Sequence, residues 1–242
     1  MELYIPAIRG IGGSLIYFVD RYSDASIYDV DFKYLDHVDR APCGVGLTEI
    51  DHLTHNVYQG DLDRWADFYR TLLNFHEVRY FDIRGSATGL KSRAMASPCG
   101  KIRIPINEPS DPKSQIQEYL DLYRGEGIQH VALATDDIYA TVEALRANGI
   151  RFMEVPDTYY DAVDQRVPGH GEAVERMRQN RILIDGAPAR GMGLLLQIFT
   201  TVVIGPIFFE IIQRKGNDGF GDGNFQALFE AIERDQIQRG VI

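Results

Sequence analysis

The sequence has few cysteines, no long apolar run and no long basic run. Its 242 residues include two cysteines, Cys43 and Cys99, which are far apart and show no metal-ligand spacing. Two are too few for a disulfide framework. No segment approaches the ~18 apolar residues of a membrane span, and the N-terminus lacks a basic segment followed by an apolar stretch. These absences predict a protein of the cytoplasm, with no membrane as partner.

The charge balance is acidic. There are 35 acidic against 25 basic residues, which gives a formal net charge of -10. Such a field repels polyanions, so a general nucleic-acid or anionic-membrane surface is excluded. The hydrophobic content of 45% is enough for a well-buried core in one large domain or two small ones.

Two segments share one order of signals from residue 50 onward. The first reads as a strand, IDHLTHNVY, a helix, DLDRWADFYRTLLNF, and a strand, EVRYFDI. Apolar residues at helical spacing follow an N-cap at Asp61: Leu62, Trp65, Tyr69, Leu72 and Leu73. The second reads as a strand, IQHVALAT, a helix, DDIYATVEALRANG, which Gly149 ends, and a strand, IRFMEV.

Further strands follow the second helix. They are RILIDG, GLLLQIFT and IFFEIIQR, and a short helical stretch, GEAVERMRQN, precedes them. Because only two copies of this long unit are present, a solenoid is excluded and a duplicated module is indicated. The sequence therefore predicts an α+β fold of two βαβββ modules, at about residues 46–125 and 126–242, that curl into an open barrel.

One carboxylate, Glu210, lies in the apolar run GPIFFEIIQRKG. An ionised carboxylate out of water is costly unless a cation or several hydrogen bonds meet it. Strand parity identifies candidate partners, because side chains alternate between the two faces of a strand. In DHLTHNV, His52 and His55 lie on opposite faces, so they cannot bind one ion together. His130 shares its face with small alanines that leave space beside the imidazole.

Each of these residues has an ordinary alternative role. A single histidine on a strand is usually hydrogen-bonded core, and a single buried glutamate is more often the partner of an arginine. The histidines His52 and His130, however, occupy the same point of the two repeats, and Glu210 lies on a late strand of the second. Two histidines and one carboxylate are the set that holds non-haem Fe(II) with open positions.

Eight ordered motifs carry a resemblance to a known family. They are DHLTHNV, IPINEP, SQIQEYL, GEGIQHVAL, PDTYY, LLLQIF, FFEIIQRKG and GFGDGNFQALFEAIE. In this order they resemble the catalytic half of the 4-hydroxyphenylpyruvate dioxygenases, which belong to the vicinal oxygen chelate group with its glyoxalase-like fold. The resemblance covers about residues 8–242. It implies an Fe(II) cofactor and conversion of 4-hydroxyphenylpyruvate and O₂ to homogentisate and CO₂ in tyrosine and phenylalanine catabolism.

The resemblance also implies roles for individual residues. The iron ligands of the family fall on His52, His130 and Glu210. The polar positions that orient the phenol and the keto acid match Ser92, Asn107, Gln115 and Gln197. The remaining positions around the substrate match Pro105, Phe199, Phe220, Asn224 and Phe225. Without the family, such amides would be expected to serve their own backbone and such phenylalanines to be core. Gln129, beside His130 with opposite parity, is a candidate support for that ligand.

The two ends of the chain give further expectations. Residues 1–45 resemble the last part of an N-terminal domain and its linker, so the strand SLIYFVD is expected to lack sheet partners and to expose an apolar edge. This edge favours a homo-oligomer. At the other end, GNFQALFEAIERDQ has apolar residues at helical spacing and predicts an amphipathic helix, which resembles a lid with Gly221 and Gly223 as its hinge. Its ordinary role would be permanent core.

Three alternatives stay open. Hydroxymandelate synthase has the same ligands and the same substrate but oxidises the benzylic carbon, and Phe199 with the intact GFGDGNF favours the homogentisate-forming branch. The second alternative is that the chain is a non-catalytic, truncated metal-binding fragment. A glyoxalase-type isomerase is disfavoured because the first module offers no further carboxylate on a strand, since Glu108 is expected in a turn.

Overall fold

The computed structural model describes residues 5–20, 28–40, 42–84 and 89–224, which form two compact units divided between Gly44 and Val45. In the first unit, β1 (Ala7–Arg9) and β2 (Leu15–Tyr17) pair as an antiparallel hairpin around a 3₁₀ turn (Ile11–Gly13), and α1 (Tyr28–Asp31) follows. The expectation that SLIYFVD lacks a partner is therefore wrong, because β1 supplies one. Its apolar side chains are nonetheless exposed, as Leu15 and Tyr17 show.

The second unit contains one sheet of eight strands in the order β4-β5-β6-β3-β7-β10-β9-β8. Their bounds are β3 (Leu47–Asn56), β4 (His76–Arg84), β5 (Gly89–Ala96), β6 (Arg103–Pro109), β7 (Gly127–Thr135), β8 (Leu183–Gly186), β9 (Leu194–Phe199) and β10 (Phe208–Lys215). The helices are α2 (Leu62–Leu73), α3 (Gln115–Tyr123), α4 (Ile138–Ala147), α5 (Asp157–Tyr160), α6 (Val163–Arg166) and α7 (Val174–Asn180), with a 3₁₀ turn at Pro188–Arg190.

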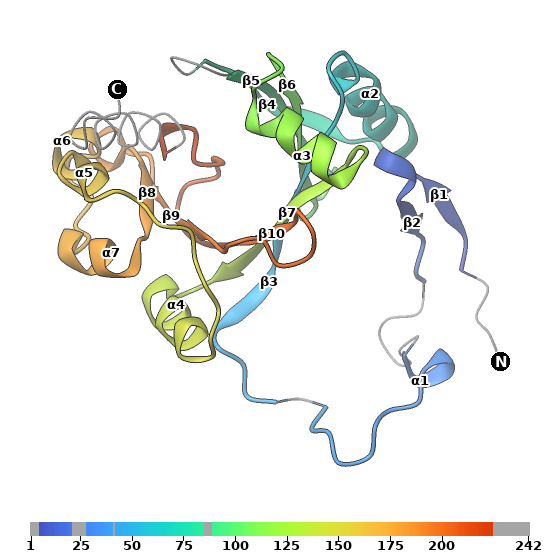
Figure 1. Cartoon of the computed structure of the whole chain (residues 1–242), viewed down its shortest axis with the longest axis horizontal. Coiled ribbons are helices and arrows are strands. Elements are labelled where there is room, and N and C mark those ends of the chain that lie inside the picture. The colour runs from blue at the N-terminus through green and yellow to red at the C-terminus, as the bar shows by residue number, and fades with distance from the viewer. Residues whose placement is uncertain (1–4, 21–27, 41, 85–88, 225–242) are drawn as a thin grey trace. The chain divides into compact units, whose positions relative to one another are not determined.

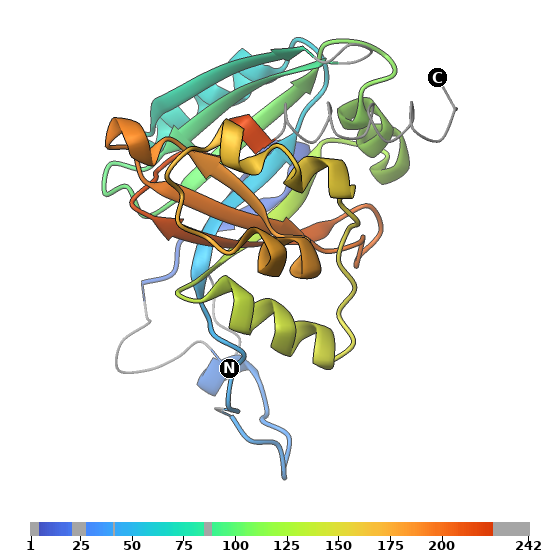
Figure 2. The same ribbon diagram turned by 90° about the vertical axis from the view of Figure 1, so that its left-hand side faces the viewer.

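This arrangement confirms the two βαβββ modules. The first is β3-α2-β4-β5-β6 and the second is β7-α4-β8-β9-β10, with α3 between them. The leading strands β3 and β7 pair antiparallel at the centre, and each also pairs parallel with the last strand of its own module. Figure 1 shows β4–β6 and β8–β9 on opposite sides of the central strands. In Figure 2 the strands of the first module lie above those of the second, with α4 beneath them.

One predicted strand is wrong. The segment IRFMEV forms only an isolated bridge between Phe152 and Thr200, at the end of β9. It makes two flanking backbone hydrogen bonds, from Met153 to Phe199 and from Thr201 to Arg151. Pro156 then starts α5, which removes the chain from the sheet edge.

The two main helices begin differently. In α4, the carboxylate of Asp137 accepts hydrogen bonds from the backbone of Tyr139 and Ala140, as an N-cap does. In α2, Asp61 occupies the N-cap position but makes no such bond. Glu108 of β6 instead accepts from the backbone N–H groups of Gly60 and Leu62 at 2.9 and 3.3 Å. Glu108 is part of β6, so it lies on a strand and not in the expected turn.

The core follows the predicted helix faces with one exception. In α2, Leu62, Trp65 and Tyr69 are buried, but Leu72 in the last turn is 56% exposed. The main apolar cluster lies in the second module, where α4 and α7 residues such as Val142 and Met177 pack with Leu196 of β9. No helix among the described residues is long and apolar enough to cross a membrane.

Candidate metal centre

The three predicted ligands come from the three central strands. His52 lies on β3, His130 on β7 and Glu210 on β10. Ala132 of β7 is the cross-strand neighbour of both His52 and Glu210 and is fully buried between them. A methyl group at this position leaves room for the imidazole and the carboxylate to turn toward each other. Parity brings His130, two residues from Ala132, to the same face.

The side chains converge on one point. His52 Nε2 and His130 Nε2 each lie 3.3 Å from the same oxygen, Glu210 Oε2. Candidate ligand atoms of the three residues all lie within 4.8 Å of one another. His55 is outside this group, and its Nδ1 instead contacts the carbonyl of Leu53. The opposite orientation of the two β3 histidines thus agrees with strand parity.

The electrostatics of the group favour a cation. Burial alone would raise the pKa of Glu210, but the imidazoles of His52 and His130 lower it to about 2. Burial lowers the pKa of His130 despite the nearby carboxylate. An ionised carboxylate and two imidazole nitrogens are therefore gathered at a buried site, and this donor set suits a divalent transition metal.

A β-bulge precedes each histidine. In β3, Ile50 pairs with Leu133 and His52 with Ala132, so Asp51 is an extra residue. Bulges redirect side chains near sites. The redirected Asp51 places Oδ1 2.7 Å from His52 Nδ1.

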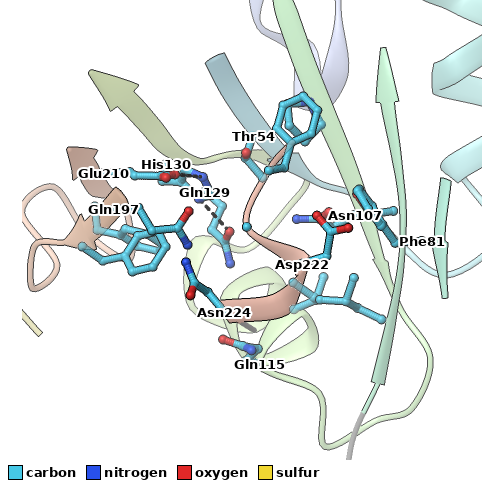
Figure 3. Close-up of a pocket in the computed structure, with 18 of the residues that line it drawn as sticks. Thr54, Phe81, Asn107, Gln115, Gln129, His130, Gln197, Glu210, Asp222 and Asn224 are labelled. Atoms are coloured by element: carbon cyan, nitrogen blue, oxygen red, sulfur yellow. Dashed lines mark hydrogen bonds and ion pairs between the residues drawn. The ribbon is translucent and has the colours of Figure 1, made fainter. Parts of the chain in front are cut away.

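The second bulge lies in β7. His55 pairs with Ile128 and Thr54 with His130, so Gln129 is the extra residue. Its Oε1 lies 3.0 Å from His130 Nδ1, a contact drawn in Figure 3. With both Nδ1 atoms hydrogen-bonded, each histidine presents Nε2 to the centre. Parity alone would have put Gln129 on the other face, but the bulge returns it to the cavity wall.

A cavity of about 500 Å³ opens beside this centre. Predicted site residues that line it with the three ligands are Ser92, Pro105, Asn107, Gln115, Gln197, Phe199, Phe220 and Asn224. Ser92 and Asn107 are direct cross-strand neighbours on β5 and β6. Phe225 and the predicted tail helix lie outside the described residues.

Aromatic rings form much of the wall around the ligands. Phe208 stacks on His130 with ring centroids 4.9 Å apart, and Phe220 meets His52 edge-on at 5.4 Å. Phe199 also contacts His130, at 6.1 Å. The sequence reasoning missed Phe208 as a site residue, although its position two before Glu210 on the same strand face was a sufficient signal.

Two amides line the cavity. Figure 3 shows Gln197 and Asn224 with their polar ends turned toward one another. Gln197 Oε1 and Asn224 Nδ2 are buried and have no hydrogen-bond partner among the described residues. The hydroxyl of Tyr159, another residue that sequence reasoning missed, lies 2.7 Å from Asn224 Oδ1. It donates to that oxygen and so turns the amide nitrogen to the cavity.

The glycines predicted as a hinge are closely packed. A Cβ on Gly221, which has φ +78°, would lie 2.3 Å from Gln197 Oε1. A Cβ on Gly223 would lie 2.3 Å from Asp185 Oδ1. Close approach is a reason for glycine at both positions, and the hinge stays a prediction.

Comparison with known proteins gives the family. The Glyoxalase/Bleomycin resistance protein/Dioxygenase superfamily matches residues 49–164, and the family described as Hydroxyphenylpyruvate dioxygenase, HPPD, N-terminal matches residues 1–33. The chain is 65% identical to 4-hydroxyphenylpyruvate dioxygenase from Pseudomonas aeruginosa, over 100% of this chain and 67% of that protein. The chain belongs to the 4-hydroxyphenylpyruvate dioxygenase family.

Two other proteins are similar to this member of the 4-hydroxyphenylpyruvate dioxygenase family. The protein named Hemolysin VllY from Vibrio vulnificus is 67% identical over 100% of this chain and 68% of its own length. A solved structure of a triple mutant of 4-hydroxymandelate synthase from Streptomyces coelicolor aligns with TM-score 0.68 and 31% identity. That alignment covers 77% of this chain and 54% of the synthase, so the chain spans about half of it.

Proposed function

We propose that the chain forms the catalytic part of an Fe(II)-dependent dioxygenase that converts 4-hydroxyphenylpyruvate and O₂ to homogentisate and CO₂, in tyrosine and phenylalanine catabolism. The observation that carries this proposal is the convergence of His52, His130 and Glu210 at the wall of a partly aromatic cavity. The 65% identity to a named dioxygenase of this kind supports it. A homo-oligomer and a cytoplasmic location remain predictions.

The metal would be held by His52 Nε2, His130 Nε2 and one oxygen of Glu210. When bound there, Fe(II) supplies the redox chemistry of O₂ cleavage, for which the substrate's own 2-oxo acid is the source of electrons. Three protein ligands leave positions open for exogenous ligands. The chain's part is to orient both imidazoles, which the contacts of Asp51 and Gln129 to the Nδ1 atoms favour by leaving Nε2 turned to the centre.

The cavity suits a flat ring with a polar group at each end. Phe199, Phe208 and Phe220 gather near the metal ligands and would enclose the substrate beside the metal. Gln197, whose Oε1 is unpartnered, and Asn224, whose Nδ2 is unpartnered, line the cavity and would hydrogen-bond the substrate. Each unpartnered atom would gain a hydrogen bond when the substrate binds, and this gain favours binding.

The first module would hold the other end of the substrate. Ser92, Asn107 and Gln115 line the cavity from β5, β6 and the start of α3. Asn107 Nδ2 lies 3.4 Å from Asn56 Oδ1, so its amide carbonyl is available to a hydroxyl. Apolar walls at Phe81 and Leu90 exclude water around the ring.

An anaerobic titration tests the proposal. The Fe(II)-loaded chain is mixed with 4-hydroxyphenylpyruvate, the visible absorption band of a 2-oxo acid on ferrous iron is recorded, and O₂ is then admitted. Homogentisate as the product, identified by chromatography, is the expected result. No band, with wild type behaving like Glu210→Ala, would refute the proposal and favour a non-catalytic fragment.

The same experiment separates the nearest alternative. The similarity to 4-hydroxymandelate synthase makes hydroxymandelate the specific rival product. Its detection would reassign the reaction while leaving the metal centre intact. A glyoxalase-type site has less support, because Glu108, the β6 carboxylate that was expected in a turn, is committed to the start of α2.

A further inference from the structure

Asp51 joins the candidate metal centre to the opposite module. Its carboxylate is buried, with 2% side-chain exposure, and faces His52 Nδ1 on one side. On the other side Arg214 of β10 binds it with two parallel hydrogen bonds, Nε to Oδ2 at 2.7 Å and Nη2 to Oδ1 at 2.8 Å. Arg103 Nη1 approaches Oδ2 at 3.4 Å. These donors fix the carboxylate in one orientation.

The remaining nitrogen of the Arg214 guanidinium, Nη1, binds the backbone of the loop that follows β10. This nitrogen donates to the carbonyls of Asn217 and Gly219, at 2.9 and 2.7 Å. The next residue is Phe220, whose ring lies 5.8 Å from the guanidinium carbon and 5.4 Å from the His52 ring. One side chain thus supports both the metal-ligand histidine and the aromatic residue packed against it.

We propose that Asp51 and Arg214 are positioning residues of the metal centre. Asp51 accepts the Nδ1–H of His52 and thereby presents Nε2 to a divalent transition metal. Arg214 locks that carboxylate and, through Asn217 and Gly219, keeps Phe220 against the same imidazole. The inference rests on the proposed function, since it needs a metal at His52.

A purely structural ion pair is the competing explanation. Asp51 and Arg214 join β3 to β10, so their pairing would stabilise the sheet even if no metal bound. The two explanations differ at His52 itself: a structural pair would leave the metal affinity and the Nδ1–H proton unchanged when the pair is altered. The test therefore uses readouts other than turnover.

The first readout is the binding of Co²⁺ to the metal-free full chain, measured by the visible absorption of the bound ion. We expect Asp51→Asn to bind Co²⁺ about 10- to 100-fold more weakly than wild type, as removal of a partner of a metal-bound histidine commonly does. Arg214→Lys should also bind more weakly, because an ammonium cannot make the two parallel bonds. The double variant Asp51→Asn with Arg214→Gln removes both charges and covers the case in which a single variant does not fold.

Glu126→Gln is the matched control. Glu126 is a buried carboxylate of the same unit that accepts from Trp65 Nε1 and Tyr58 N but touches no proposed ligand. It should bind Co²⁺ like wild type. If the Asp51 and Arg214 variants fold and also bind like wild type, the proposal is overturned. If wild type itself binds no Co²⁺, the metal centre of the proposed function fails, and this inference fails with it.

The Nδ1–H proton of His52 gives the second readout. In the Zn²⁺-loaded chain with ¹⁵N-labelled histidine, we expect its resonance to be slowly exchanging and shifted further downfield than that of His130, whose acceptor Gln129 is neutral. The resonance should move upfield in Asp51→Asn and stay in place in Glu126→Gln. An unchanged resonance in folded Asp51→Asn would overturn the proposal.

Discussion

The two modules place their histidines with the same backbone device and support them with different chemistry. Each histidine follows the extra residue of a β-bulge, whose side-chain oxygen lies against Nδ1. In the first module that residue is Asp51, an anion held by Arg214 of the second module. In the second it is the neutral Gln129. The difference indicates that His52 is tied across the module boundary, whereas His130 is supported within its own strand.

A second difference concerns the helices. The second module starts α4 with a local cap, Asp137, while the first starts α2 with a carboxylate from β6, Glu108. The start of α2 therefore depends on the sheet being formed. Both differences can be tested by replacing the corresponding residues in each module. The replacements follow from the largest expected effect to the smallest.

Glu210→Ala should have the largest effect, because it removes the ligand that both histidines face. We expect Fe²⁺ or Co²⁺ affinity to fall by more than the ~100-fold typical of losing a supporting partner. Equilibrium dialysis measures it. His55→Ala, which alters the other face of β3, is the control and should bind metal normally if it folds. Equal binding by wild type and Glu210→Ala would contradict a centre shared between the modules.

Glu108→Ala should be next. It leaves the backbone N–H groups of Gly60 and Leu62 without their acceptor, so the free energy of unfolding should fall by about 2 kcal/mol. Urea unfolding measures this loss. Asp61→Ala, at the position predicted to cap the helix from the sequence, should lose less because Asp61 makes no capping bond. The reverse order would mean that the local cap is the effective one.

Gln129→Met should weaken metal binding less than Asp51→Asn does. Its carbonyl oxygen is a neutral acceptor for His130 Nδ1, and neutral hydrogen bonds are roughly half as strong as charge-assisted ones. We expect a Co²⁺ affinity within about 10-fold of wild type. An effect larger than that of Asp51→Asn in the same titration would reverse the comparison of the two modules.

Asp137→Ala should have the smallest effect. It removes a local N-cap that accepts from Tyr139 and Ala140, which costs about 1 kcal/mol of unfolding free energy. Urea unfolding measures this loss, and metal binding should stay as in wild type. A loss as large as that of Glu108→Ala would show that the two helices depend equally on their caps.

Sequence reasoning predicted the fold and the ligand group for a physical reason. The period of two along a strand determines which side chains share a face, and the repeat identifies equivalent points of the two modules. His52 and His130 follow from these two patterns, Glu210 follows from its place in an apolar run, and the structure brings the three together. Their assignment as metal ligands stays a prediction until a metal is observed there.

Features that depend on register or on distant pairing could not be predicted in this way. A bulge adds one residue and reverses the face of its side chain, so Gln129 lines the cavity against its parity and Asp51 turns to His52. The partner of Asp51 is 163 residues away, and no local pattern indicates it. Glu108 was expected in a turn at Asn-Glu-Pro, but β6 continues through Pro109.

Anomalous X-ray diffraction at the iron edge, from crystals of the Fe(II)-loaded chain, tests the central claim most directly. One peak per chain is predicted, bonded to Nε2 of His52, Nε2 of His130 and a carboxylate oxygen of Glu210, with Asp51 and Gln129 still on the two Nδ1 atoms. Iron bound through an Nδ1 atom, or at any place that leaves Glu210 unbound, would contradict the account.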